Sequence, residues 1–328
     1  MDKKIKVGIC GYGNLGRGVE SEIGKNADME FAAVFTRRKP AEALKIQADV
    51  PVVHTDGAAG WKDKIDVMIL CGGSANDLPA QGPGFAGVFN TVDSFDTHAK
   101  IPDYFARMDG AAKAGNKISV VSVGWDPGLF SLMRLYTGAV LPAGKTYTFW
   151  GKGVSQGHSD AVRGVQGVLD AVQYTVPIDS VVRRIRNGET PELSAREKHT
   201  RVCYVVAAAG ADKRRIEQEI KQMPYYFDEY DTAVHFVSAE ELKAEHGTLP
   251  HGGSVIRAGT TGIGHQHSLE FSLKLDSNPE FTASVLLAYA RAAYRLSQKG
   301  ESGARTVFDV PPALLWSAGT MDAVQNLL

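Results

Sequence analysis

The sequence predicts an α/β protein of two domains, a doubly wound parallel sheet at the N-terminus followed by an α+β domain for substrate binding and dimerisation. Three observations support this fold class. A glycine-rich turn follows the first apolar segment, short apolar runs alternate with helical segments up to about residue 127, and the pattern becomes mixed from residue 128 onward. A chain of 328 residues also exceeds what one hydrophobic core usually serves.

The composition is that of an ordinary globular protein, with 44% hydrophobic and 22% charged residues. A formal net charge of −1 gives no reason to expect binding to nucleic acid or to an anionic membrane. The three cysteines Cys10, Cys71 and Cys203 are scattered and form no metal-binding spacing, so we expect no metal site and no disulfide framework. No signal-peptide core or membrane-spanning run is present, and we expect a cytoplasmic protein.

The first element is a strand over residues 5–10 that runs into Gly11, Gly13 and Gly16, spaced G-x-G-x-x-G. Gly11 allows a tight turn, Gly13 lets a pyrophosphate approach the backbone, and Gly16 lets the next helix pack closely on the strand. The helix over residues 14–25 then offers free N–H groups to phosphates. This strand–turn–helix predicts a Rossmann-type, dinucleotide-binding domain.

The second strand, residues 29–35, ends at Thr36, Arg37 and Arg38. A protein that prefers NAD usually has an acidic residue here, about 20 residues beyond the glycines, to bind the ribose hydroxyls. A hydroxyl and two guanidinium groups suit a 2′-phosphate instead, because arginine offers forked, charge-assisted donors. The sequence therefore predicts NADP as the cofactor.

Further buried strands are predicted at residues 66–71, 89–92 and 117–123, with a helix at 102–114. The Gly72–Ser74 loop after the first of these should pass along the dinucleotide. Asp93 and Asp126 follow the other two strands, and Trp125 precedes Asp126. Two carboxylates at equivalent strand ends predict a cation-binding site, for which an ammonium group is a suitable ligand.

The second domain is expected to contain a mixed or antiparallel sheet, which often presents a face to a partner subunit. Its predicted elements are strands at 146–151, 171–177, 201–207, 232–237 and 267–275, helices at 162–172 and 213–223, and a polar loop at 153–160. A long helix at 281–298 and a short strand at 306–310 complete the chain. We expect domain boundaries of 1–127 and 128–280, with 281–328 returning to the nucleotide domain.

Five motifs together resemble the meso-diaminopimelate dehydrogenase family, and the resemblance runs along essentially the whole chain. They are Gly11-Tyr12-Gly13-Asn14-Leu15-Gly16-Arg17, Gly124-Trp125-Asp126-Pro127-Gly128, Thr148-Phe149-Trp150-Gly151, Ser155-Gln156-Gly157-His158-Ser159-Asp160 and Leu249-Pro250-His251-Gly252-Gly253. The resemblance implies NADP-dependent oxidative deamination of meso-2,6-diaminopimelate at its D-centre, by a cytoplasmic homodimer.

The family resemblance also implies roles for individual residues. The reacting D-centre would be met by Asp93, Trp125 and Asp126, with Gln156 and Asp160 nearby, and the distant L-centre by Phe149, Thr175, Arg201, His251 and Asn278. NADP would be held by Gly11, Tyr12, Gly13, Asn14, Leu15, Gly16, Thr36, Arg37, Arg38, Cys71, Gly72, Gly73 and Ser74.

The chemistry of these side chains fits the implied substrate. Arg201 can bind a carboxylate in a bidentate manner, and Asp93 and Asp126 can bind an ammonium group. Asp126 is the candidate for holding and deprotonating the amine, although a bound water could take the proton instead.

Two other functions remain open at this point. One is another reductase of the same architecture, such as a semialdehyde dehydrogenase or a dihydrodipicolinate reductase. It would need a nucleophilic cysteine in the catalytic domain or a basic His-Lys cluster. Cys203 instead lies in an apolar strand, and Cys71 lies in the glycine loop, where a packed thiol is expected. The second alternative is a non-catalytic NADP-sensing protein, which needs no two-ended polar site.

Overall fold

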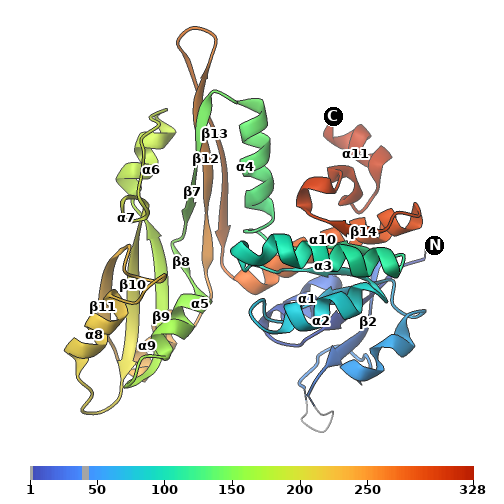
Figure 1. Cartoon of the computed structure of the whole chain (residues 1–328), viewed down its shortest axis with the longest axis horizontal. Helices are drawn as coiled ribbons and strands as arrows, with labels where there is room; N and C mark the ends of the chain where they lie inside the picture. The colour runs from blue at the N-terminus through green and yellow to red at the C-terminus, as the bar shows by residue number, and fades with distance from the viewer. Residues whose placement is uncertain (1–2, 39–43) are drawn as a thin grey trace. The chain divides into compact units, whose positions relative to one another are not determined.

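The computed structural model describes residues 3–38 and 44–328. It forms two compact units, one comprising Met1–Leu132 with Pro279–Leu328 and the other Met133–Asn278 (Figure 1). The predicted boundaries lay at residues 127/128 and 280/281, a few residues from these. The C-terminal segment is thus part of the N-terminal unit.

Unit 1 is built on a parallel seven-stranded sheet with the order β14-β6-β5-β4-β1-β2-β3. Its central strands are almost entirely apolar, because both faces of the sheet are covered. Strands β2 and β3 follow one another on one side of β1, and β4, β5, β6 and β14 follow one another on its other side. The strand order therefore reverses between β1 and β4, which makes this position the topological switch point of the sheet. The strands are β1 Ile5–Cys10, β2 Met29–Thr36, β3 Val52–His54, β4 Val67–Leu70, β5 Asn90–Asp93, β6 Ile118–Val120 and β14 Gly303–Arg305.

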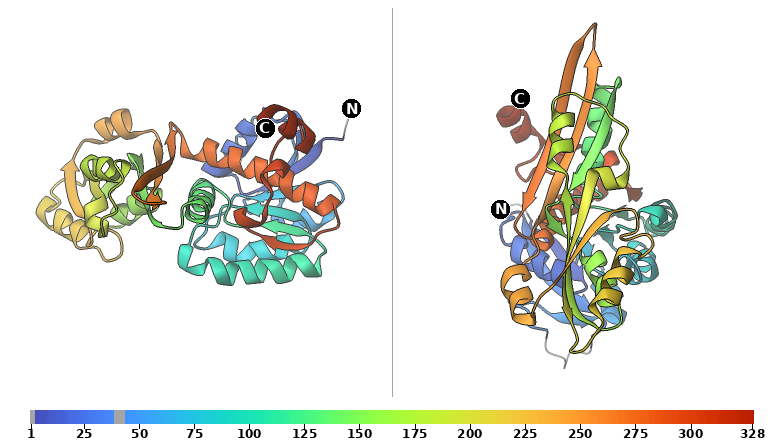
Figure 2. Two further views of the ribbon diagram at one scale, coloured as in Figure 1. Left: turned by 90° about the horizontal axis from the view of Figure 1, so that it is seen from above. Right: turned by 90° about the vertical axis from the view of Figure 1, so that its left-hand side faces the viewer.

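Helices cover both faces of this sheet (Figures 1 and 2). Apolar side chains of α1, α10 and the segment after β14 share one core with one face, and those of α2 and α3 share a second core with the other. The helices of this unit are α1 Asn14–Ile23, α2 Asp77–Ala86, α3 Ile101–Ala114, α10 Asn278–Gln298 and α11 Thr320–Leu327. Helix α4, Leu129–Val140, leads from unit 1 into unit 2.

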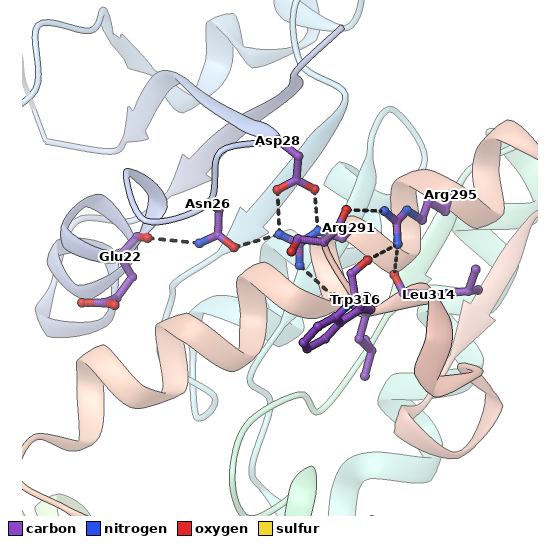
Figure 3. A network of polar contacts seen from close by, with 9 residues as sticks. Glu22, Asn26, Asp28, Arg291, Arg295, Leu314 and Trp316 are labelled. Carbon is purple, nitrogen blue, oxygen red and sulfur yellow. Dashed lines mark hydrogen bonds and ion pairs between the residues drawn. The ribbon is translucent and has the colours of Figure 1, made fainter. Parts of the chain in front are cut away.

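A buried arginine ties the C-terminal segment to the N-terminal part of unit 1 (Figure 3). Arg291 on α10 is 3% exposed and donates two hydrogen bonds to the Asp28 carboxylate, at 2.5 and 2.8 Å. It also donates to Asn26 Oδ1 and to the Leu315 carbonyl. Arg295, one turn later, donates to the carbonyl of Trp316 at 2.7 Å. These bonds hold residues at opposite ends of the chain in one unit.

The predicted strand at 306–310 is wrong. Residues Val307–Asp309 form a 3₁₀ turn, and the strand that joins the sheet is β14, Gly303–Arg305. The Thr306 hydroxyl accepts from the Phe308 N–H, while the Asp309 carboxylate accepts from the Thr306 N–H. This capping box satisfies the backbone hydrogen bonds locally, so the apolar run forms a 3₁₀ turn and does not pair with a strand of the sheet.

Unit 2 contains two sheets. The first has the order β11-β10-β9-β8, with β10 and β11 parallel and the other pairs antiparallel, and the second has the antiparallel order β13-β12-β7. The β12–β13 hairpin is long (Figure 2). The elements are β7 Gly144–Trp150, β8 Gly153–Val154, α5 Gln156–Arg163, β9 Val168–Pro177, α6 Asp179–Arg186, α7 Ala195–Lys198, β10 His199–Ala207, α8 Lys213–Lys221, β11 Asp231–Phe236, α9 Ala239–His246, β12 His251–Thr261 and β13 His265–Leu275.

Two predictions in this unit are wrong. The expected loop at 153–160 contains β8 and the first turns of α5, and the expected helix at 162–172 is not formed, because α5 ends at Arg163 and β9 begins at Val168. The helix stops at Gly164, and Gly167 adopts a φ of +89°, a conformation that no helix continues through.

Candidate functional site

The glycine turn between β1 and α1 has the geometry that its spacing predicts. Gly11 has a φ of +97°, and a Cβ on Gly16 would lie 2.4 Å from the Gly11 carbonyl oxygen. A Cβ on Gly13 would meet nothing within 4 Å. The first and third glycines are therefore required by the fold, whereas the second leaves open space that a ligand can approach.

A cavity of about 650 Å³ opens beside this turn, at the switch point of the sheet. Its walls come from the ends of β1, β2 and β4, where such sheets bind dinucleotides. Most of the predicted cofactor residues line it, whereas Asn14, Leu15, Gly16 and Ser74 do not. The lining residues are Cys10, Gly11, Tyr12, Gly13, Thr36, Arg37, Arg38, Thr55, Cys71, Gly72, Gly73, Asp77 and Gln81.

Asp77 links two parts of the cavity wall through its carboxylate. It was not predicted as a site residue from the sequence. One of its carboxylate oxygens pairs with Arg37 at 2.5 Å, and the other accepts from the Gly73 N–H at 3.1 Å. Thr36 Oγ1 accepts from the Arg38 N–H at 3.1 Å, which shapes the turn that carries both arginines. The Arg37 and Arg38 side chains are exposed, so they can meet a phosphate group. This donor set fits NADP.

The thiols near the cavity are not nucleophiles. Burial raises the pKa of Cys10 to about 12 and raises the pKa of Cys71 well above its usual value. Burial likewise raises the pKa of Cys203 to about 12. All three are free cysteines that stay protonated at neutral pH. Cys71 is partly buried: it packs against the core of unit 1 and also lines the cavity.

Asp93 lies at the end of β5 as predicted, but its carboxylate is closed to solvent. It is fully buried, and its oxygens accept from the N–H groups of Phe95 and Ser122 and from the Tyr104 hydroxyl, at 2.9 to 3.1 Å. Burial raises its pKa to about 6. Asp93 therefore holds two strand-end loops in place through these hydrogen bonds. The structure does not support the prediction that its carboxylate contacts an ammonium group.

Asp96, three residues further along the same loop, is exposed. Its backbone N–H donates to Ser74 Oγ at 3.1 Å, so the loop is tied to the glycine-rich segment after β4. Sequence reasoning selected the first aspartate of Asp93-Ser94-Phe95-Asp96 because it directly follows the strand. The alternation of buried and exposed positions, with Phe95 fully buried, is the signal that favours Asp96.

Trp125 and Asp126 lie in the loop after β6. Trp125 is 7% exposed and packs edge-on against Phe130, with ring centroids 5.3 Å apart. Asp126 is partly exposed. The Asp93 main-chain oxygen accepts from the Val123 N–H at 2.8 Å, so the buried aspartate and its own backbone fix the loop that carries Asp126.

Arg201 and Thr175 form the centre of the predicted site in unit 2. They are directly paired across β9 and β10, and the guanidinium donates to the Thr175 hydroxyl. The Arg201 guanidinium carbon lies 4.0 Å from the Tyr230 ring centroid. Burial lowers the pKa of Arg201 from its usual value, and no carboxylate of the described residues forms an ion pair with it.

Phe149 is part of the apolar core of unit 2. It is 1% exposed and packs in an apolar cluster with Tyr147, Ile185 and Ile256. The next residue, Trp150, stacks on His199 with centroids 5.4 Å apart, and its N–H donates to His199 Nε2 at 2.8 Å. Trp150 is only half-buried, so it is the better candidate of the two. Alternation along β7 turns adjacent side chains to opposite faces.

The remaining predicted residues of unit 2 lie on α5 and at the starts of β12 and α10. Gln156 and Asp160 are exposed on α5, where Asp160 pairs with Arg163. His251 begins β12, and its Nδ1 lies 2.8 Å from the Gly252 nitrogen. Asn278 begins α10, and its N–H donates to the Leu249 carbonyl at 3.1 Å. Among the described residues no cluster of metal-binding side chains is present.

No helix in the described part of the chain is long and apolar enough to cross a membrane.

Comparison with known proteins gives a consistent result. Residues 124–277 match the family model of the diaminopimelic acid dehydrogenase C-terminal domain. The chain is 62% identical over 325 residues to the meso-diaminopimelate D-dehydrogenase of Ureibacillus thermosphaericus, covering 99% of both chains.

Two solved structures extend the likeness. A mutant meso-dapdh from Clostridium tetani E88 with DAP matches 99% of this chain and 100% of its own, at 52% identity and a TM-score of 0.94. An engineered D-amino acid dehydrogenase bound to NADP+ matches 99% and 100%, at 44% identity and a TM-score of 0.88.

Proposed function

We propose roles for the residues of this chain from the premise that it belongs to the meso-diaminopimelate D-dehydrogenase family. It is an NADP-dependent oxidoreductase that deaminates meso-2,6-diaminopimelate at the D-centre to L-2-amino-6-oxoheptanedioate and ammonia. NADP, when bound, supplies the acceptor for the hydride that leaves the α-carbon. One proton leaves the ammonium group, and one water then hydrolyses the resulting iminium ion to the carbonyl group and ammonium.

The observation that carries the residue assignment is the buried, unpaired charge of Arg201. A buried cation without a carboxylate partner is unfavourable unless a ligand supplies the negative charge. With Thr175 beside it, Arg201 offers a forked set of donors to one carboxylate. We assign this pair to the carboxylate of the L-centre, with His251 and Asn278 as further candidates at that end.

The reacting D-centre is assigned to the strand-end loops of unit 1. Asp126 binds the ammonium group and takes its proton directly or through a bound water. Asp96 replaces Asp93 as the second carboxylate, because it is exposed while Asp93 is closed off by its three donors. Trp125 forms the apolar wall beside Asp126, and Gln156, Asp160 and Trp150 are assigned to the substrate.

The cofactor is assigned to the cavity at the switch point of unit 1. Thr36, Arg37 and Arg38 bind the 2′-phosphate, and the turn from Gly11 to Gly16 binds the pyrophosphate. Gly72, Gly73 and Ser74 follow the rest of the dinucleotide. Unit 1 is thus the dinucleotide-binding domain, and unit 2 the substrate-binding and dimerisation domain.

Stereochemical selection follows from the remote anchor. The two ends of the substrate carry the same groups, so only fixing the L-end places the D-hydrogen for transfer. NADP reduction followed at 340 nm should be rapid with meso-diaminopimelate and near background with LL-diaminopimelate and D-alanine. Equal rates with the LL-isomer would contradict the assignment.

A homodimer in the cytoplasm is also proposed. The exposed apolar side chains Leu135, Tyr136 and Val140 on α4 support a subunit contact, because the last two are one turn apart on the same helix. The three free cysteines agree with a reducing compartment. Light scattering after size exclusion, which should give twice the 35.3 kDa chain mass, tests the dimer, and cell fractionation tests the location.

A further inference from the structure

Gln173 in strand β9 is fully buried, yet neither atom of its side-chain amide makes a hydrogen bond. Its backbone is held firmly. The Gln173 N–H donates to Ser159 Oγ at 2.9 Å, and its carbonyl accepts from the Ser155 N–H at 3.0 Å. Buried amides without partners are rare because desolvation is not offset by a bond. The side chain is therefore placed for a group that is not part of unit 2.

The position of Gln173 relative to Arg201 follows from the strand register. Thr175 pairs with Arg201, and Gln173 pairs with Cys203, so Gln173 and Arg201 are diagonal neighbours across β9 and β10. Residues 171, 173 and 175 share one face of β9, because side chains alternate along a strand. Diagonal neighbours on one face are about 7–8 Å apart, a gap that two long side chains can span.

Arg201 also has a buried side-chain atom without a hydrogen-bond partner. Its Nε is buried and makes no hydrogen bond, although its other end bonds Thr175. Two titratable groups that interact electrostatically with Arg201 carry no negative charge that could neutralise it. Burial keeps the thiol of Cys203 protonated by raising its pKa to about 12, and burial keeps His158 neutral by lowering its pKa to about 4. One face of the sheet thus carries two unpaired donors and one unpaired acceptor.

An α-amino-acid head group matches this set. Its carboxylate accepts from Arg201 Nε and Gln173 Nε2, and its ammonium group donates to Gln173 Oε1. We propose that Gln173 is a specificity-determining residue that binds the L-centre head group together with Arg201 and Thr175. This inference rests on the proposed function, and it adds a residue that binds the ammonium group of the L-centre.

The substitution Gln173→Leu tests this inference through two effects of opposite sign. Removing an unpaired buried amide should leave the melting temperature of the ligand-free protein unchanged or higher. The KM for meso-diaminopimelate should rise about tenfold or more, by more than kcat falls, because hydrogen bonds to charged groups are lost. The KM for NADP should not change. Gln218→Leu, an exposed glutamine on α8, is the matched control and should change neither quantity.

Gln173→Met, which keeps the side-chain length, answers the same question if the leucine variant does not fold. A lower melting temperature with an unchanged KM would overturn the inference, since it would mean that the amide serves the fold. An unchanged KM at an unchanged melting temperature would overturn it as well. Wild-type protein that fails to reduce NADP with meso-diaminopimelate would instead refute the proposed function, and the inference with it.

Discussion

Arg201 and Thr175 face each other across strands β9 and β10, and the guanidinium donates to the threonine hydroxyl in the buried interior of unit 2. The same guanidinium lies against the Tyr230 ring, and no carboxylate of the described residues neutralises it. Threonine and tyrosine orient the cation without cancelling its charge. We therefore expect this arrangement to bind an anion from outside the chain.

The first prediction concerns this cation. Arg201→Met should reduce kcat/KM for meso-diaminopimelate at least about a hundredfold, which corresponds to about 2.7 kcal/mol. Because the L-end anchor is lost, the ratio of D-alanine to meso-diaminopimelate activity should rise. Initial rates at 340 nm with both substrates measure this. Kinetics for meso-diaminopimelate equal to those of the wild type would refute the role of Arg201.

The second prediction concerns cofactor choice. Replacing Arg37 and Arg38 by alanine should raise the KM for NADP by about tenfold per residue, because charge-assisted hydrogen bonds to a phosphate are lost. The KM for NAD, which has no 2′-phosphate, should change by less than about twofold. Arg183→Ala, an exposed arginine on α6, is the control. Equal losses with both cofactors would contradict the assignment.

The third prediction separates two neighbouring aspartates. Asp96→Asn should lower kcat about tenfold or more, because a carboxylate that meets the ammonium group is removed. Asp93→Asn keeps an oxygen that can accept from Phe95 and Ser122 and should retain most of the activity. Both variants are measured at saturating NADP. The reverse order of losses would restore Asp93 as the second carboxylate.

The fourth prediction is a pH dependence of stability. Burial raises the pKa of folded Asp93 to about 6, above the value of about 3.9 for an unfolded chain. Between these values the folded state binds more protons than the unfolded state, so this group lowers stability as pH rises and contributes nothing below both values.

Asp93→Asn should therefore gain stability relative to the wild type between pH 4 and pH 7, by roughly 1–3 kcal/mol. Urea denaturation at several pH values gives this difference. A difference between the two proteins that is flat with pH would mean that Asp93 titrates normally in the folded state.

The fifth prediction concerns the bond between the two ends of unit 1. Arg291→Leu should destabilise the protein by about 3–5 kcal/mol, because the Asp28 carboxylate and the Leu315 carbonyl lose their donor. Burial alone would raise the pKa of Asp28, but the bonds from Arg291 hold it below its usual value. Asp28 hence stabilises the wild type above its unfolded pKa, and this contribution is lost as pH falls through the folded pKa.

Denaturant titrations at neutral and acidic pH test this prediction. The variant should lose the part of the acid sensitivity that Asp28 causes. Arg184→Ala, which removes an exposed ion pair with Glu189, should change stability by less than about 1 kcal/mol. A loss in Arg291→Leu no larger than in this control would show that the C-terminal segment does not depend on the bond.

Much of unit 1 was predictable from local pattern. The glycine spacing after an apolar strand imposes one turn geometry, and the basic residues Arg37 and Arg38 at the end of β2 follow from their place in the chain. These features depend on contacts within about 30 residues, so the sequence carries them directly. The family motifs likewise indicated Arg201 and Thr175.

Other features were decided by contacts between distant segments. The sequence does not distinguish Asp93 from Asp96 as a ligand-binding carboxylate. The hydrogen bonds from Ser122 and Tyr104 show that Asp93 is the buried one of the two. The sequence does not show that the Gln173 side chain is buried without hydrogen-bond partners. This becomes visible only when β9 and β10 are paired in the folded protein. The fold class and the cofactor type follow from the amino-acid sequence alone, and the family motifs predict the anchor residues Arg201 and Thr175. Only the folded protein shows which buried polar groups have an internal partner and which lack one, because hydrogen-bond partners far apart in the chain meet only in the folded unit.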